Sequence, residues 1–266
     1  MKNLFLFLFL LVVFTSKAQD NRVSGLNSRQ FTKYWKVESE SPDYKVTFQG
    51  DTAEIVSPKG LTLWRKEKMS GKVTIEYDAC VVVESDGDRL SDLNCFWMAS
   101  DPQYPDNLWK REKWRSGIFL NCYSLQLYYL GYGGNHNSTT RFRRYDGDES
   151  GITNPKARPA ILKEYTDAGH LLKPNHWYHI KITNENNRVS YYIDGERLVD
   201  FRDAEPLREG WFGFRTTLSR TRITNFSYEC SSQEAAAVPL QWIGETPRQD
   251  KAVSFGVPFD KGEVFP

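Results

Sequence analysis

Hydrophobic and polar positions alternate along most of the chain, which is typical of β-strands that bury one face. The segment 71–84, GKVTIEYDACVVVE, alternates in this way and is rich in β-branched residues. The segment 93–99, LNCFWMA, is again mostly apolar, and the polar turn SDGD lies between the two. Two such segments joined by a short polar turn predict a β-hairpin.

The second half of the chain repeats this pattern of apolar segments separated by short polar turns. Only the segment 156–167, KARPAILKEYTD, has room for a short helix, and Pro159 disfavours one. Successive strands joined by short turns predict an all-β protein, an antiparallel two-sheet sandwich or jelly roll, in one domain over residues 24–231. The later strand segments are WYHIKIT (177–183), RVSYYI (188–193), ERLVDF (196–201), GWFGFRT (210–216) and RTRITNFSYEC (220–230).

The first 18 residues have the pattern of a cleaved secretory signal. Lys2 precedes the apolar block LFLFLFLLVVF, and the small-residue stretch SKA follows. We therefore expect residues 1–18 to be removed, the mature chain to begin near Gln19, and the protein to be secreted or periplasmic. The apolar block is shorter than the roughly 20 residues of a membrane-spanning helix, and no later run approaches that length, so no membrane span is expected.

Charge and cysteine content narrow the classes of ligand. The chain has 35 basic and 34 acidic residues, and without the signal its formal charge is about −1. This near balance disfavours nucleic acid as a partner, because phosphate binding needs a basic surface. The four cysteines lack the paired spacing of a zinc site, so no metal bound through sulfur is expected. Disulfides and buried free thiols both remain open in an exported chain.

The sequence NHWYHIKITNENNRVSYYIDGERLVDF, followed by GWFGFRTTLSRTRITNFSYE, resembles the C-terminal half of a concanavalin A-like jelly roll. The whole region from about residue 30 to 231 is similar to the YesU-like group of exported bacterial proteins found beside rhamnogalacturonan-degrading enzymes. The resemblance implies a concanavalin A-like antiparallel jelly-roll sandwich. It also implies an acidic, pectin- or rhamnogalacturonan-like polysaccharide as the substrate class.

The C-terminal residues 232–266 are predicted to be a linker and a tail. SSQEAAAVP is rich in small residues, and GVPFDKGEV, with Asp260 in place of a proline, resembles the start of exo-rhamnogalacturonan-lyase-like proteins. The tail is then a truncated second domain. The alternative is a terminal arm that packs back on the jelly roll.

The stretch 130–145, LGYGGNHNSTTRFRRY, carries few apolar side chains and is the candidate site. In the strand before its loop, alternation places Leu125, Leu127 and Tyr129 on one face. If these leucines face the core, Tyr128 and Tyr132 face away from it.

The strand after the loop carries the charged part of the candidate site. Alternation places Arg141, Arg143 and Tyr145 on one face, and Phe142 and Arg144 on the other. We expect the two strands and the polar loop between them to form the wall and rim of a concave site.

Arginines beside tyrosines suit an acidic sugar, because a guanidinium matches a carboxylate with two parallel hydrogen bonds and a tyrosine ring stacks on a sugar face. Cleavage of a uronate chain by β-elimination needs a group that neutralises the carboxylate, a base for the C5 proton and an acid for the leaving oxygen. No metal or cofactor is required. Arg141 or Arg143, together with Asn135, is the candidate group that neutralises the carboxylate. His136 or Tyr132 is the candidate base. Tyr145 or Tyr128 is the candidate acid, and Tyr128 is also a candidate for stacking on the sugar.

Three other interpretations compete with a polysaccharide lyase. The same surface serves a non-catalytic glycan-binding module, and the arginines can instead pair with acids such as Asp146 on a solvated surface. A retaining glycoside hydrolase is disfavoured, because SDLNCFW offers Asp92, Asn94 and Phe96 where these jelly rolls carry Glu, Asp and Glu. The chain is thus predicted to be an exported protein that binds or cleaves an acidic polysaccharide.

Overall fold

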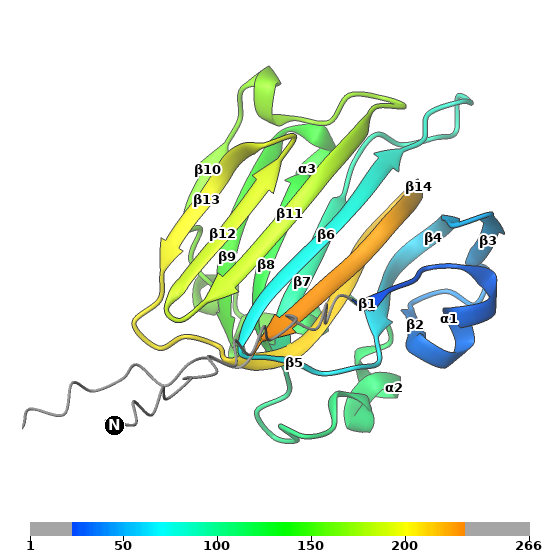
Figure 1. Cartoon of the computed structure of the whole chain (residues 1–266). Coiled ribbons are helices and arrows are strands. Elements are labelled where there is room, and N and C mark those ends of the chain that lie inside the picture. Colours follow the sequence, from blue (N-terminus) through cyan, green and yellow to red (C-terminus); the bar gives the residue numbers. More distant parts are fainter. Residues whose placement is uncertain (1–22, 232–266) are drawn as a thin grey trace, which may run out of the picture. The chain divides into compact units, whose positions relative to one another are not determined.

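The computed structural model describes residues 23–231, which form two packed layers of antiparallel strands (Figure 1). The predicted signal (1–18) and the predicted linker and tail (232–266) lie outside the described residues. The predicted all-β antiparallel sandwich is confirmed: alternating apolar and polar positions fold as strands, and their apolar faces meet between the layers.

One layer carries the candidate site, and we call it the site sheet. In spatial order it consists of β10 (Lys163–Tyr165), β9 (Thr139–Asp146), β8 (Gln126–Gly133), β7 (Leu93–Ser100), the first half of β14 (Glu209–Ser231), the second half of β4 (Thr52–Arg65) and β2 (Trp35–Ser39).

The other layer, which we call the opposite sheet, contains the hairpins predicted in the second half of the chain. The hairpin predicted for residues 71–84 and 93–99 is wrong, because the strand Lys72–Val81 pairs in this layer, whereas β7 belongs to the site sheet. Its order is β13 (Glu196–Arg202), β12 (Arg188–Ile193), β11 (Trp177–Glu185), β6 (Lys72–Val81), the second half of β14, the first half of β4 and β3 (Lys45–Gln49).

β14 and β4 run through both layers and join them. The pairing of the two strands shifts register between Thr217 and Ser219, where Leu218 has a positive φ of 49° and an exposed side chain. On one side of this irregularity β14 pairs with β7, and on the other it pairs with β6. The two short strands β1 (Val23–Ser24) and β5 (Met69–Ser70) also pair with β14.

Short helices connect the strands. The segment 156–167, considered above for a helix, contains one 3-10 turn and the edge strand β10, in keeping with Pro159. The helices are α1 (Ser28–Tyr34), α2 (Glu112–Arg115), α3 (Gly134–Asn137) and α4 (Ser150–Thr153), and the 3-10 helices are η1 (Leu108–Arg111), η2 (Leu120–Ser124), η3 (Pro155–Ala157) and η4 (Ala168–His170).

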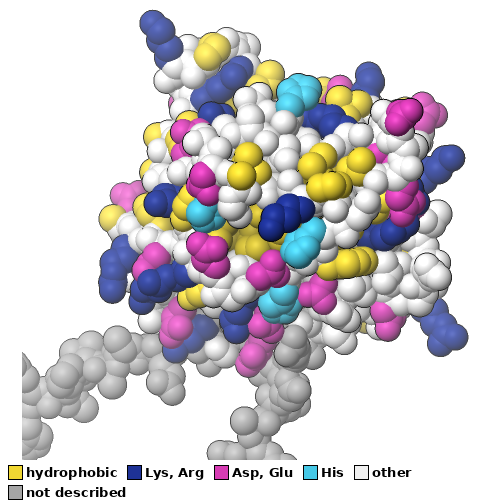
Figure 2. All heavy atoms as spheres, turned by 90° about the horizontal axis from the view of Figure 1, so that it is seen from above, with side chains coloured by type: hydrophobic (Ala, Val, Ile, Leu, Met, Phe, Trp, Pro, Cys, Tyr) yellow, Lys and Arg dark blue, Asp and Glu magenta, His cyan; other side chains and the backbone are white. Residues whose placement is uncertain are grey.

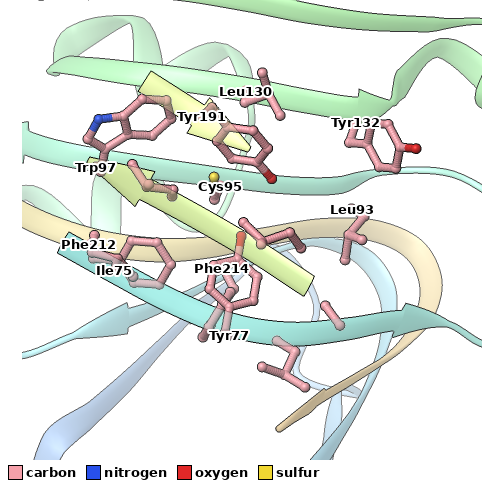
Figure 3. Packing of buried hydrophobic residues seen from close by; sticks show 14 of the residues in the cluster. Ile75, Tyr77, Leu93, Cys95, Trp97, Leu130, Tyr132, Tyr191, Phe212 and Phe214 are labelled. Carbon is pink, nitrogen blue, oxygen red and sulfur yellow. The ribbon is translucent and has the colours of Figure 1, made fainter. Parts of the chain in front are cut away.

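The main core lies between the layers. Trp97 of β7 packs against Tyr128 of β8, Phe142 of β9 and Tyr191 of β12, with ring centroids 5.7, 6.0 and 6.1 Å away. Figure 3 shows Trp97, Tyr191 and Tyr132 among the aromatic and aliphatic side chains of this cluster. The burial of these large rings provides the main stabilisation of the sandwich.

A second buried cluster lies on the outer face of the site sheet, under the segment 108–124. Trp64, Phe96 and Tyr129 belong to it. Arg115 of α2 holds the segment in place: its Nη2 lies 2.9 Å from Glu38 Oε2 and also donates to the carbonyl of Leu108 at 2.7 Å. Arg115 is 0% exposed. Burial raises the pKa of Glu38, and the adjacent guanidinium of Arg115 opposes that shift.

The structure reverses the predicted orientation of β8. Tyr128 and Tyr132 face the core between the layers, whereas Leu127 and Tyr129 face the second cluster. The prediction that Tyr128 and Tyr132 face away from the core is therefore wrong. Because both faces of β8 are covered, its leucines did not mark the inner face.

The structure also bears on the choice between disulfides and free thiols, and on the presence of a membrane-spanning helix. The alternative of free thiols holds, since all four cysteines lie within the described residues and are free, and Cys80, Cys95 and Cys122 are buried. Among residues 23–231, no helix has the length and apolar composition needed to cross a membrane.

Candidate ligand-binding site

A pocket of about 360 Å³ opens on the outer face of the site sheet, beside the part that the segment 108–124 covers. Its lining includes four arginines and two carboxylates, so positive charge is in excess. The arginines are Arg89, Arg141, Arg143 and Arg215, and the carboxylates are Glu40 and Asp92.

The basic wall of the pocket comes from β9. Alternation along this strand turns Arg141 and Arg143 to the pocket, while Phe142 enters the core, as the sequence predicted. Arg141 Nε lies 2.5 Å from Glu164 Oε1 on the edge strand β10. Arg143 donates to the carbonyl of Pro159, which is a neutral partner.

Tyr129 of β8 contributes an aromatic ring and a hydroxyl to the pocket. The ring lies over Gly131, where an added Cβ would be 2.3 Å from the tyrosine hydroxyl oxygen. Burial and the nearby carboxylate of Asp92 raise the pKa of Tyr129, while Arg215 and Arg143 lower it by less. The phenol therefore stays protonated and offers both a donor and an acceptor.

The segment 108–124 supplies the aromatic side of the pocket through Phe119 and Tyr123. The ring of Phe119 lies 5.5 Å from that of Tyr129. The guanidinium of Arg215 lies 5.6 Å from the Phe119 ring, and its Nη1 donates to the carbonyl of Gly117 at 2.5 Å. Arg215 thus both fixes this segment and adds positive charge to the pocket.

A polar cluster from the other side of β8 completes the lining. Arg89 Nη1 lies 2.6 Å from Asp92 Oδ2 and donates to the carbonyl of Thr217 at 3.0 Å. Asn94 Nδ2 donates to Asp92 Oδ1 at 3.2 Å. The three residues form one connected set, which we call the Asp92 cluster.

Three of the seven residues predicted for the site line the pocket. They are Asn135, exposed at α3, and the two β9 arginines. Asn135 Nδ2 donates to Ser138 Oγ at 3.1 Å within its own loop.

The other four predicted residues do not line this pocket. Tyr128 donates its hydroxyl to Asp203 Oδ2 at 2.6 Å, and Tyr132 donates to the carbonyl of Leu171 at 3.3 Å, both on the core side. Tyr145 is fully buried below the pocket among Tyr123 and Tyr129, and its hydroxyl has no partner among residues 23–231.

His136, the fourth of these residues, is exposed in α3 with a positive φ of 58°. The other three histidines pair with acids instead: His170 with Asp167 and Glu196, His176 with Asp194, and His179 with Asp78. Figure 2 shows histidine side chains among acidic, basic and hydrophobic ones on the face seen from above, with no single sign of charge dominating.

Sequence reasoning missed Tyr129, Arg215 and the Asp92 cluster as pocket residues. Alternation groups Tyr129 with the leucines of the predicted core. Asp92 and Asn94 bear on the sequence argument only as a poor match to the glucanase pattern. Asp92 and Asn94 are polar residues at alternate positions, and they precede the apolar strand residues Cys95 to Trp97. This contrast is the signal in the sequence that could have indicated this side of the pocket. Among residues 23–231, no group of three or more His, Cys, Asp or Glu side chains is arranged to hold a metal ion.

A family model described as "Domain of unknown function (DUF6250)" matches residues 55–226, which include β6 to β13 and most of β14. The chain belongs to this family. No curated protein matches it in sequence.

Solved structures share the fold at low sequence identity. A protein of unknown function with a galectin-like fold from Bacillus subtilis has a TM-score of 0.62 and 15% identity, over 80% of this chain and 96% of that one. The Emp47p carbohydrate recognition domain has a TM-score of 0.51 and 14% identity, over 80% and 96%. The exoplasmic/lumenal domain of VIP36, in a Ca²⁺/Man3GlcNAc-bound form, has a TM-score of 0.53 and 8% identity, over 82% and 91%.

Proposed function

We propose that the protein binds an acidic carbohydrate in the pocket on the site sheet, with a uronate carboxylate on Arg141 and Arg143. The observation that carries this proposal is the pair of β9 arginines beside the Tyr129 ring, in a pocket with more arginines than carboxylates. Guanidinium groups bind carboxylates in a fork geometry, and an aromatic ring provides an apolar contact for a sugar face.

Two fold neighbours support a glycan as the ligand class. One is described as a carbohydrate recognition domain, and the other was solved with Man3GlcNAc. The similarity of residues 30–231 to proteins beside rhamnogalacturonan-degrading enzymes favours a pectin-like polymer within that class. The signal-like residues 1–18 favour binding outside the cytoplasm, and a secreted or periplasmic product should begin near Gln19.

The geometry favours binding over β-elimination. The residues predicted as base and acid, His136, Tyr132 and Tyr145, do not line the pocket with the arginines. Tyr129 does line it, but its raised pKa keeps the phenol protonated, so it serves as a proton donor and not as a base. We therefore expect binding without formation of an unsaturated product.

The test is calorimetric titration of the protein with trigalacturonate. The double variant Arg141→Ala/Arg143→Ala should bind roughly 10- to 100-fold more weakly, because charged hydrogen bonds to the carboxylate are lost. Arg202→Ala, an exposed arginine on β13 of the opposite sheet, is the matched control and should bind like wild type. Unchanged affinity in the double variant would contradict the proposal, and a rise in ultraviolet absorbance from unsaturated product would establish a lyase instead.

A further inference from the structure

Two polar atoms of the Asp92 cluster are buried without a hydrogen-bond partner among residues 23–231. They are Asn94 Oδ1 and Arg89 Nε. Asn94 is only 6% exposed and lines the pocket. Its amide orientation is determined, because the carboxylate of Asp92 only accepts hydrogen bonds and so must face the NH₂ group. The amide oxygen is left as an unsatisfied acceptor.

A buried polar group without a partner costs about 1–3 kcal/mol, and native structures contain few of them. Here one orphaned acceptor and one orphaned donor lie in the same cluster, on either side of the Asp92 carboxylate. Together they suit a pair of neighbouring hydroxyl groups, which can donate hydrogen bonds to Asn94 Oδ1 and to the Asp92 carboxylate, while one of the two accepts a hydrogen bond from Arg89 Nε.

The register of the site sheet relates this cluster to the arginines. Asn94 of β7 lies opposite Gly131 of β8, which lies opposite Arg141 of β9. Neighbouring strands are about 4.8 Å apart, so the backbones of Asn94 and Arg141 are separated by roughly 10 Å. Gly131 between them has no side chain, and the ring of Tyr129 lies over it.

This spacing suits one sugar ring lying across β8. In a pyranose uronate the carboxylate is attached at C5, and C2 is the ring atom opposite C5, with C3 beside it. A ring with its carboxylate on the β9 arginines therefore presents its 2- and 3-hydroxyls toward β7. The Tyr129 hydroxyl lies between the two ends, because it is placed over Gly131, which separates Asn94 from Arg141.

We propose that Arg89, Asp92 and Asn94 form a subsite for the 2,3-diol of the uronosyl residue whose carboxylate the β9 arginines hold. This inference rests on the proposed function and narrows it. The ligand must carry a free carboxyl group on one edge of a sugar ring and two free hydroxyls on the opposite edge of the same ring. Acylation at O2 or O3 weakens binding, because it removes the hydroxyl donors from which Asn94 and Asp92 accept hydrogen bonds.

The test compares trigalacturonate with its 2,3-di-O-acetylated form by calorimetry. Wild type should bind the acetylated ligand at least tenfold more weakly. Asn94→Ala should weaken the binding of trigalacturonate about tenfold, through loss of one buried hydrogen bond. It should leave the binding of the acetylated ligand unchanged. Asn187→Ala, an exposed asparagine between β11 and β12, is the matched control and should change neither.

The outcomes separate this inference from the proposed function. If Arg141→Ala/Arg143→Ala leaves the affinity for trigalacturonate unchanged, the proposed function itself is contradicted. If the arginine variant weakens binding while wild type tolerates acetylation, the diol subsite alone is wrong. The acetylated ligand needs only wild-type protein, so this second outcome is readable even if Asn94→Ala fails to fold.

Discussion

β8 and β9 are neighbours in one sheet, and both alternate, yet alternation gave the correct orientation for only one of them. In β9, Phe142 alternates with Arg141 and Arg143, and the apolar side chain faces the core. In β8 the two alternating sets are both apolar or aromatic, and both are buried, one between the layers and one under the segment 108–124. Periodicity groups side chains by face, but only a contrast in polarity shows which face is inside.

The largest test of this comparison is Tyr128→Ala. Tyr128 is fully buried in the main core, and truncation of a buried aromatic side chain costs about 3–5 kcal/mol. Urea unfolding should show a loss of this size, whereas Tyr44→Ala, at an exposed tyrosine, should change stability by less than about 0.5 kcal/mol. A small effect for Tyr128 would mean that β8 has the orientation first predicted.

Tyr145→Phe tests the face of β9 that also carries Arg141 and Arg143. The buried hydroxyl of Tyr145 has no partner among residues 23–231, and leaving such a group unsatisfied costs about 1–3 kcal/mol. Its removal should raise the unfolding free energy by about 1 kcal/mol and leave trigalacturonate affinity unchanged. A clear loss of stability in thermal unfolding would show that the hydroxyl has a bonding partner.

Two tyrosines of β8 form a matched pair that sharpens the comparison. Tyr132→Phe removes a hydrogen bond to the Leu171 carbonyl and should cost about 1 kcal/mol without changing ligand affinity. Tyr129→Phe removes a hydroxyl in the pocket and should leave stability within about 0.5 kcal/mol while weakening binding severalfold. Urea unfolding and calorimetry give the change in stability and the change in ligand affinity for each variant. If the two variants behave alike, the two faces of β8 are not functionally distinct.

The smallest expected effect concerns the protonation of His170, in the loop that supports α3 between β8 and β9. Burial lowers the pKa of His170, but hydrogen bonds with Asp167 and Glu196 outweigh it and raise the pKa above 6.5. Since the folded-state pKa is the higher one, the stabilisation is complete below about pH 6.5 and is lost as pH rises through the raised value. NMR titration should show the raised pKa of His170, and Glu196→Gln should lower that pKa by removing one of the two acidic partners.

Local pattern predicted the strands well and the site only in part. The hairpins from Trp177 to Arg202 follow from alternation and polar turns, which are properties of neighbouring residues. The grouping of Arg141 with Arg143 follows in the same way. The pocket also depends on the position of the segment 108–124, which is set by the long-range pair Glu38–Arg115. No local pattern encodes that contact, so Tyr129 and Asn94 were missed.

The placement of β14 determines when the protein can fold. This strand is the last one described, and it lies at the centre of both sheets, with Phe214 opposite both Leu63 and Cys95. Pairing across such long stretches of chain requires closure of large loops, which slows folding. Until the chain is available as far as Ser231, the opposite sheet lacks its complete central strand. The growing chain therefore stays open, and its edges must be protected from aggregation until synthesis has passed this point.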